Sequence, residues 1–213
     1  MTVDARSAAA VVLAGGNSRR FGSDKGGARW CNRSLLEHVI ARLPVDRAET
    51  IVVLRAEQEL DLRPEWTIIH DDPSLPAGPL RAVVQGLAAC HSDWAWVVAC
   101  DQPLLDTRLL AALSESAGGE HAVIPCWQDH LQPLTGLYAT TCGTNLLGCL
   151  ESGERSLIGA LETIGFKIFT EAQCRLIDPA GVGFLNINHP EQMAELERLA
   201  AASDDGRKDL EVD

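Results

Sequence analysis

The residues best suited to chemistry lie in a short glycine-rich and basic stretch near the start of the chain. An apolar run, Ala9–Leu13, leads into Ala14-Gly15-Gly16, and Arg19, Arg20 and Lys25 follow. Glycines allow backbone N–H groups to approach an anion closely, and the basic residues supply positive charge in an otherwise acidic protein. The stretch therefore predicts a loop that binds phosphate groups.

The spacing within this loop excludes two common phosphate-binding motifs. The loop does not contain G-x-x-x-x-G-K-[ST], so it is not a P-loop, and it does not contain the dinucleotide-binding pattern G-x-G-x-x-G. A dinucleotide-binding domain also needs an acid at the end of its second strand, where this chain has Leu54-Arg55.

Two acidic residues follow further apolar runs. Asp71 comes after Trp66–His70, and Asp101 comes after Trp94–Ala99. Open α/β sheets bind ligands at the carboxyl ends of their strands, so both positions favour a functional role. Magnesium takes one or two carboxylates together with phosphate oxygens and water, so a single well-placed Asp is enough for it. Asp72 is interpreted as a turn residue, the alternative being that it exchanges roles with Asp71.

The elements that must position these residues are predicted from hydrophobic patterns. Runs rich in Val and Ile alternate with amphipathic helical patterns, which is typical of β-α-β units around a mostly parallel sheet with helices on both faces. The predicted strands are Ala9–Leu13, Thr50–Leu54, Trp66–His70, Trp94–Ala99, Ala122–Pro125, Leu134–Tyr138 and Phe166–Phe169. The predicted helices are Ser34–Leu43, Pro79–Cys90, Thr107–Ser116, Thr141–Leu150, Arg155–Ile164 and Pro190–Ala201.

Length and composition indicate one domain and exclude several classes of protein. With 213 residues, 46% of them hydrophobic, we expect one α/β domain over 9–202, a flexible N-terminus over 1–8 and a disordered polar tail over 203–213. The net charge of −12 disfavours nucleic acid as a partner. No apolar run approaches the roughly 18 to 20 residues of a membrane span, and no signal peptide is recognisable, so we expect a cytoplasmic protein.

The cysteines and histidines do not encode a metal site. The seven cysteines form no C-x-x-C pair, and the six histidines show no H-x-x-x-H spacing. We expect the cysteines to be reduced and mostly buried.

The loop from Leu13 to Lys25 resembles L-A-G-G-x-S-x-R-x-G-x-D-K, the signature of molybdenum cofactor guanylyltransferases and their nucleotidyltransferase relatives. The resemblance extends from Val11 to about Leu196 and implies a single Rossmann-like three-layer domain with a mostly parallel sheet, of the nucleotide-diphospho-sugar transferase type. Six further motifs carry it: Asp71, Gly78-Pro79-Leu80, Cys100-Asp101-Gln102-Pro103, Gln132-Pro133-Leu134 with Tyr138, Gly153-Glu154-Arg155-Ser156-Leu157 and Phe184-Leu185-Asn186-Ile187-Asn188-His189-Pro190.

The resemblance implies a reaction and its participants. GMP is transferred from GTP to the terminal phosphate of molybdopterin or a related phosphorylated acceptor, with Mg²⁺ as cofactor and pyrophosphate as second product. Molybdoenzymes or cofactor-delivery proteins are implied as further partners. Such a transfer needs charge neutralisation and alignment rather than covalent catalysis.

The resemblance also assigns roles to residues. Lys25 and Arg19 suit the triphosphate as a point charge and a planar fork, and the family's metal ligand falls on Asp101, so these three are the expected catalytic residues. A carboxylate at Asp71 suits the N1–H and N2–H₂ donors of guanine. The expected nucleotide-binding residues are Leu13, Ala14, Gly15, Gly16, Lys25, Asp71, Gly78 and Asp101, and the expected acceptor-binding residues are Arg155, Asn186 and Asn188. The last two are two apart in an extended segment and so point to one side.

Three positions depart from the family pattern. Family members often carry N-G-[KR]-P-L where this chain has Cys31-Asn32-Arg33-Ser34-Leu35, although Asn32 tolerates positive φ, so we expect the turn to survive. Leu54 replaces an expected polar residue, and Arg81 interrupts the usual G-P-L-A-G. These changes bear on the substrate more than on the fold.

Three alternatives to the guanylyl reaction stay open. A cytidylyltransferase for the same cofactor usually reads L-A-A-G, whereas this loop has Gly15. A transferase for another phosphorylated metabolite would use the same machinery. A non-catalytic nucleotide-binding regulator is disfavoured because Lys25 and Asp101 are both present.

Overall fold

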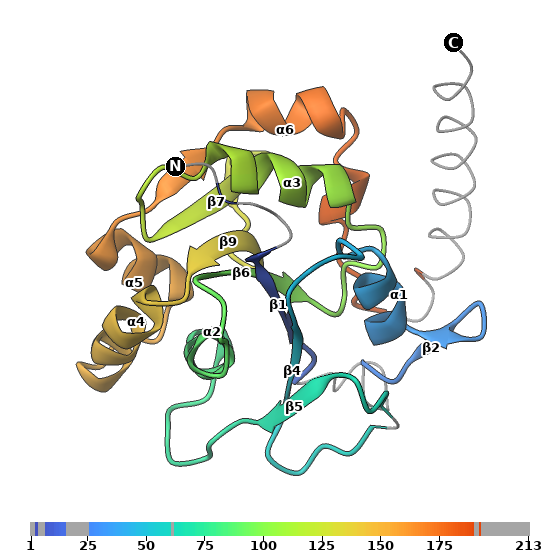
Figure 1. Ribbon diagram of the computed structural model, residues 1–213, viewed down its shortest axis with the longest axis horizontal. Coiled ribbons are helices and arrows are strands. Elements are labelled where there is room, and N and C mark those ends of the chain that lie inside the picture. The colour runs from blue at the N-terminus through green and yellow to red at the C-terminus, as the bar shows by residue number, and fades with distance from the viewer. Residues whose placement is uncertain (1–2, 4–6, 16–25, 61, 190–191, 193–213) are drawn as a thin grey trace.

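The computed structural model describes residues 3, 7–15, 26–60, 62–189 and 192 (Figure 1). Three predicted site residues, Gly16, Arg19 and Lys25, lie outside the described residues. So do the predicted tail over 203–213 and the predicted helix over 190–201, apart from Gln192. No helix among the described residues is long and apolar enough to cross a membrane.

An eight-stranded sheet forms the middle layer of the described chain. Its strands are β1 (Ala9–Leu13), β4 (Thr50–Leu54), β5 (Thr67–His70), β6 (Trp94–Ala99), β7 (Ala122–Trp127), β8 (His130–Leu131), β9 (Thr135–Ala139) and β10 (Lys167–Phe169). Seven of them follow the order β10-β7-β9-β6-β1-β4-β5, and β8 pairs with β7. The pairs β6–β1, β1–β4, β4–β5 and β7–β10 are parallel, whereas β9 runs antiparallel to β6 and β7. The predicted mostly parallel sheet is confirmed.

Helices cover both faces of the sheet. They are α1 (Leu35–Ala41), α2 (Pro79–Ala88), α3 (Thr107–Ser116), α4 (Cys142–Glu151), α5 (Leu157–Ile164) and α6 (Glu171–Ile177). Figure 1 shows α3 and α6 on one side and α2, α4 and α5 on the other, and α1 packs in the same core cluster as α3. Strand β1 supplies both cores, because successive side chains alternate between them: Ala10 and Val12 face one, Ala9 and Val11 the other.

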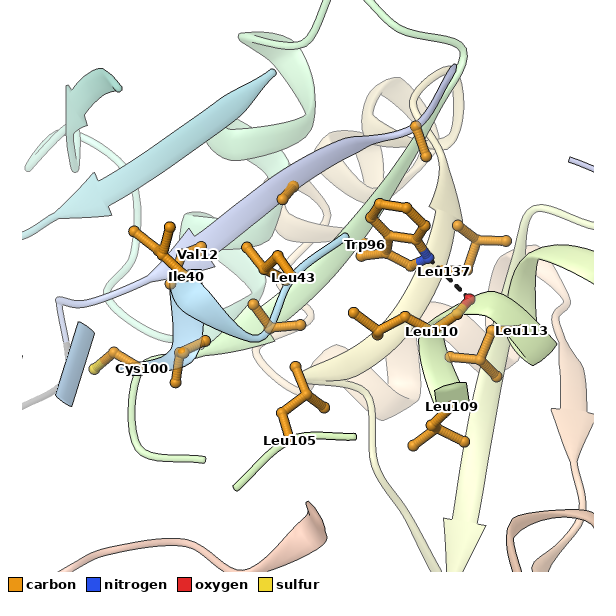
Figure 2. Close-up of a cluster of buried hydrophobic side chains, with 14 of the residues drawn as sticks. Val12, Ile40, Leu43, Trp96, Cys100, Leu105, Leu109, Leu110, Leu113 and Leu137 are labelled. Carbon is orange, nitrogen blue, oxygen red and sulfur yellow. Dashed lines mark hydrogen bonds between the residues drawn. The ribbon is translucent and has the colours of Figure 1, made fainter. Parts of the chain in front are cut away.

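The core on the α3 side is centred on Trp96 (Figure 2). This side chain is fully buried and packs among Leu109, Leu110, Leu113 and other apolar side chains. Its indole N–H donates to the carbonyl of Leu110 and to the Ser114 hydroxyl, both at 3.1 Å. A buried aromatic side chain with its polar atom satisfied gives this layer a well-defined packing.

Several element boundaries differ from the predictions for a local reason. Helix α1 begins at Leu35 because Ser34 caps it, in a capping box with Glu37, and α5 begins at Leu157 because Ser156 caps it. The hairpin of β2 (Arg29–Trp30) and β3 (Arg33–Ser34) was not predicted. Its two-residue turn has positive φ at Cys31 and at Asn32, so the expectation that Asn32 preserves a turn is confirmed.

The cysteines are all free thiols, as expected. Only Cys31 is exposed, and four of the seven are buried. Burial raises the pKa of Cys90 and of Cys142 to about 12, so neither thiol ionises at neutral pH.

Candidate active site at the carboxyl edge of the sheet

The glycine-rich loop begins between two neighbouring strands. The backbone N–H of Ala14 donates to the carbonyl of Val53 on β4, at 2.9 Å. On the other side, the carbonyl of Leu13 accepts from the N–H of Cys100, directly after β6, at 3.0 Å. Leu13 and Ala14 are both buried, so the start of the loop is fixed in the middle of the sheet edge.

Gly15 lies against the backbone that follows β4. A Cβ added at Gly15 would be 3.1 Å from the backbone N of Arg55 and 3.2 Å from its Cγ, which is tighter than ordinary contact. The chain returns to the same place after residues 16–25, because a Cβ added at Gly26 would lie 3.4 Å from the Cβ of Ala14. The two described ends of the loop therefore lie side by side, and the roles of Gly16, Arg19 and Lys25 stay predictions.

A residue that the sequence did not indicate, Gln58, fastens the start of the loop. Its Nε2 donates to the carbonyl of Ala14, and its Oε1 accepts from the N–H of Arg55, both at 3.0 Å. The residue is only 3% exposed, and its carbonyl is 3.1 Å from Nε2 of His70. A lone glutamine in a polar connecting segment has no pattern that would have identified it.

Asp71 leaves β5 at the same edge. Its backbone N–H donates to the carbonyl of Leu54 at 2.8 Å, and its side chain is 8% exposed. The carboxylate Oδ2 accepts from a guanidinium N–H of Arg81 on α2, with N and O 2.7 Å apart. Arg81, which departs from the family pattern, therefore contacts a residue expected to bind the nucleotide.

The neighbouring Asp72 has the structure of a turn residue, as interpreted. Its Oδ1 accepts from the backbone N–H of Ser74 at 2.8 Å. A hydrogen bond from the Ser74 side chain, together with this backbone bond, lowers the pKa of the Asp72 carboxyl. Its exposed carboxylate is engaged within its own turn.

Gly78 precedes helix α2 and lies near the backbone of Arg155. Its φ of 150° is a conformation that favours glycine, and Pro79 opens the helix without a side-chain cap. A Cβ at Gly78 would be 3.9 Å from the carbonyl of Arg155. The Arg155 guanidinium donates to the carbonyls of Leu150 and Glu154, both at 2.8 Å, so it is partly engaged in the connection between α4 and α5.

The segment after η2 (Val182–Phe184) runs beside Asp101. The carbonyl of Asp101 accepts from the N–H of Ile187 at 2.8 Å. Ile187 is buried, whereas Asn186 and Asn188 on either side of it are exposed. The structure thus brings both asparagines next to the half-buried Asp101.

Gln102 holds the backbone beside Asp101. It is 2% exposed, and its Oε1 accepts from the hydroxyl of Thr135 on β9 at 2.6 Å. Both side chains are buried, so this bond connects the Asp101 segment to the antiparallel strand.

The two acids of the site lie on different strands of the edge. Asp71 follows β5 and Asp101 follows β6, with β4 and β1 between them. At the usual strand spacing of about 4.8 Å, their strands are roughly 14 Å apart. Accordingly, the described residues contain no group of three or more His, Cys, Asp or Glu side chains that could hold a metal ion. Asp101 still fits Mg²⁺ as a single hard carboxylate, because phosphate oxygens and water complete such a site.

Comparison with known proteins shows the family of this chain. The family model for the MobA-like NTP transferase domain matches residues 10–164. The chain belongs to the MobA-like NTP transferase family. The segment that matches this family runs from β1 to the end of α5 and so includes Asp71, Asp101 and Arg155, while Asn186 and Asn188 lie beyond it.

Two relatives of this MobA-like chain match it over most of their length. A protein from Chloroflexus aggregans, named probable molybdenum cofactor guanylyltransferase, is 32% identical over 189 residues, which is 86% of this chain and 90% of that protein. A protein of the same name from Bacillus cereus is 25% identical over 194 residues, 89% of this chain and 96% of that protein. The predicted family resemblance is confirmed.

Solved structures show the same fold. Molybdopterin-guanine dinucleotide biosynthesis protein A from Archaeoglobus fulgidus matches with a TM-score of 0.76 and 26% identity, over 91% of this chain and 99% of that one. The 2-C-methyl-D-erythritol 4-phosphate cytidylyltransferase from Thermus thermophilus matches with a TM-score of 0.69 and 16% identity, over 94% and 100%. The MobA-like chain therefore has the predicted nucleotide-diphospho-sugar transferase fold and is a nucleotidyltransferase.

Proposed function

We propose that the protein transfers GMP from GTP to the terminal phosphate of molybdopterin, giving molybdopterin guanine dinucleotide and pyrophosphate. The observation that supports this most is the 2.8 Å bond between the Asp101 carbonyl and the N–H of Ile187. It holds the backbone of Asp101, whose carboxylate is the candidate metal ligand, beside the segment that carries the two asparagines expected to bind the acceptor. Relatives named for this reaction, at 25% and 32% identity, support the choice of substrates.

In the proposed reaction, an oxygen of the acceptor phosphate attacks the α-phosphorus of GTP. A new P–O bond forms, the bond to the β-phosphate oxygen breaks, and pyrophosphate leaves with its electron pair. The protein's task is to align the two phosphates and to stabilise the charge on them. Mg²⁺, held by Asp101, would neutralise phosphate charge when bound.

The separation of the two acids suits an extended nucleotide, with its base near one acid and its phosphates near the other. Asp71, on the β5 side, would accept hydrogen bonds from guanine, while Asp101, on the β6 side, would lie near the phosphates. The fixed start of the loop at Leu13 and Ala14 lies between them, where the triphosphate would cross the sheet edge. Lys25 and Arg19 would supply positive charge there, and Gly78 would let the start of α2 approach the ligand.

On the acceptor side, Asn186 and Asn188 present amides that donate and accept hydrogen bonds, which suits both a pterin and a phosphate. Arg155 would add a positive charge for the acceptor. Delivery of the product to molybdoenzymes or carrier proteins in the cytoplasm is part of the proposal.

A coupled assay for pyrophosphate release tests the reaction. GTP, CTP, ATP and UTP are compared with Mg²⁺, with and without molybdopterin. We expect release to be much faster with GTP than with the other nucleotides, and to occur only when molybdopterin is present. Release with CTP instead would favour the cytidylyl reaction, and release that does not depend on molybdopterin would point to another acceptor.

A further inference from the structure

We propose that Arg81 is a positioning residue for base recognition: it holds Asp71 through one carboxylate oxygen and leaves the other to accept an N–H donor of guanine. This inference rests on the proposed function, and it concerns a position where the chain departs from its family's pattern. Arg81 does not reach the reacting phosphates in this scheme, so it acts only through Asp71.

Arg81 is anchored at several points. One terminal guanidinium nitrogen donates to Oδ2 of Asp71 at 2.7 Å. The other donates to the carbonyl of Leu75 at 2.9 Å and lies 3.3 Å from that of Asp72. The Arg81 side chain is 12% exposed. One buried guanidinium thus fixes both the carboxylate and the connection between β5 and α2.

The ion pair leaves two polar atoms unsatisfied. Oδ1 of Asp71 and Nε of Arg81 are buried and have no hydrogen-bond partner in the described part of the chain. A two-point pair between guanidinium and carboxylate would satisfy more of these atoms. Here the second terminal nitrogen is committed to the loop carbonyls, so the carboxylate is held at one point.

Unsatisfied buried acceptors are rare, and an ionised carboxylate oxygen accepts strongly from N–H donors. Oδ1 therefore suits a ligand that presents an N–H group. Guanine offers two adjacent donors, N1–H and N2–H₂, on one edge, whereas cytosine offers a single donor, N4–H₂, beside the acceptors N3 and O2, which a carboxylate repels. An ion pair that holds the Asp71 carboxylate in one position would sharpen this discrimination.

Nucleotide binding and turnover together test the proposal. Calorimetry and steady-state kinetics are measured with GTP and CTP for the wild type, Arg81→Met and Arg81→Lys. For Arg81→Met we expect the preference for GTP over CTP to fall by on the order of tenfold, through KM for GTP, with kcat within about twofold. Arg81→Lys should recover part of the preference, because it restores the charge without the fork.

A double-mutant cycle shows whether Arg81 acts through Asp71. In an Asp71→Asn background, Arg81→Met should change the GTP preference little, because the carboxylate that it positions is gone. The double variant also removes both buried charges, so it and Arg81→Lys serve if Arg81→Met alone does not fold. Arg175→Met is the control, since Arg175 pairs with Glu171 at 2.6 Å on α6.

The outcomes separate this inference from the proposed function. A wild type that prefers GTP, combined with an Arg81→Met variant that keeps that preference, overturns the inference and leaves the guanylyl reaction intact. Equal losses for GTP and CTP, or equal effects of Arg81→Met in both Asp71 backgrounds, also overturn it. A wild type without preference for GTP overturns both.

Discussion

The two halves of the candidate site are held together in different ways. On the nucleoside side (Gly15, Arg55, Gln58, Asp71 and Arg81), buried side chains make the decisive hydrogen bonds. On the acceptor side (Asp101, Asn186 and Asn188), a backbone bond to Ile187 brings the segments together and leaves the two asparagines exposed. Substitutions on the nucleoside side should therefore change stability and binding together, whereas those on the acceptor side should change acceptor binding or turnover without changing stability.

The strongest test of the acceptor side is Asp101→Asn. The substitution keeps the size of the side chain and one oxygen ligand but removes the charge, so turnover should fall by at least about a hundredfold. The melting temperature should stay nearly constant, and raising the Mg²⁺ concentration should restore part of the activity. Asp129→Asn, in the turn between β7 and β8, is the control. Unchanged turnover and Mg²⁺ dependence would remove Asp101 from the metal site.

On the nucleoside side, Gln58→Glu should impair binding and stability at once. A carboxylate cannot donate to the carbonyl of Ala14, so a buried acceptor loses its partner. We expect KM for GTP to rise by on the order of tenfold and the melting temperature to fall by a few degrees. Gln128→Glu, in an exposed turn, controls for the added charge. Loss of stability with an unchanged KM would show that Gln58 serves the fold only.

Asn186→Ala and Asn188→Ala should have a smaller effect, confined to binding of the acceptor. Each removes an exposed amide, so the melting temperature should not change, while KM for the acceptor rises by about three- to tenfold. The affinity for GTP should be the same as in the wild type. Asn145→Ala, on the exposed face of α4, is the control. A change in GTP affinity of similar size would move the asparagines to the nucleotide.

The N-cap of helix α1 lies outside both halves of the candidate site, so its loss should affect stability alone. Ser34→Ala removes the N-cap of α1 and should cost about 1 kcal/mol of unfolding free energy, with activity unchanged. The backbone N–H and the hydroxyl of Ser34 both donate to Glu37 and lower the pKa of this carboxyl from its usual 4.5, and Ser34→Ala removes the hydroxyl's share. A lowered carboxyl pKa stabilises the fold above pH 4.5, and this contribution disappears as the pH falls through the folded-state pKa. Urea unfolding at pH 7 and pH 3.5 should therefore show a smaller difference between the two proteins at pH 3.5.

The sequence was most informative where apolar runs are uninterrupted. Strands β1, β4 and β6 were predicted with their observed bounds because every residue of β1 and β4, and all but the first of β6, is buried. Helix α6 was missed because it buries only Cys174 and so has no apolar stripe. The antiparallel direction of β9 depends on pairing with distant strands, which a local pattern does not encode.

The same contrast applies to the site. Asp71 and Asp101 could be placed at the sheet edge because Asp71 directly follows a predicted strand and Asp101 follows another after one residue. The contacts of Gln58 with Ala14, 44 residues away, and of Arg81 with Asp71 depend on the paths of connecting segments. Such pairings leave no periodic signal, so only the structure identifies them.

The adjacency of Ala14 and Gly26 has a consequence for how this enzyme could change over time. Because the intervening segment leaves and re-enters the sheet edge at one place, its composition and length can vary without altering any strand pairing. Lengthening such a closed segment costs little, about 0.6 kcal/mol of closure entropy for each doubling. If residues 16–25 carry the predicted chemistry, selection can act on it while the scaffold beneath is inherited unchanged.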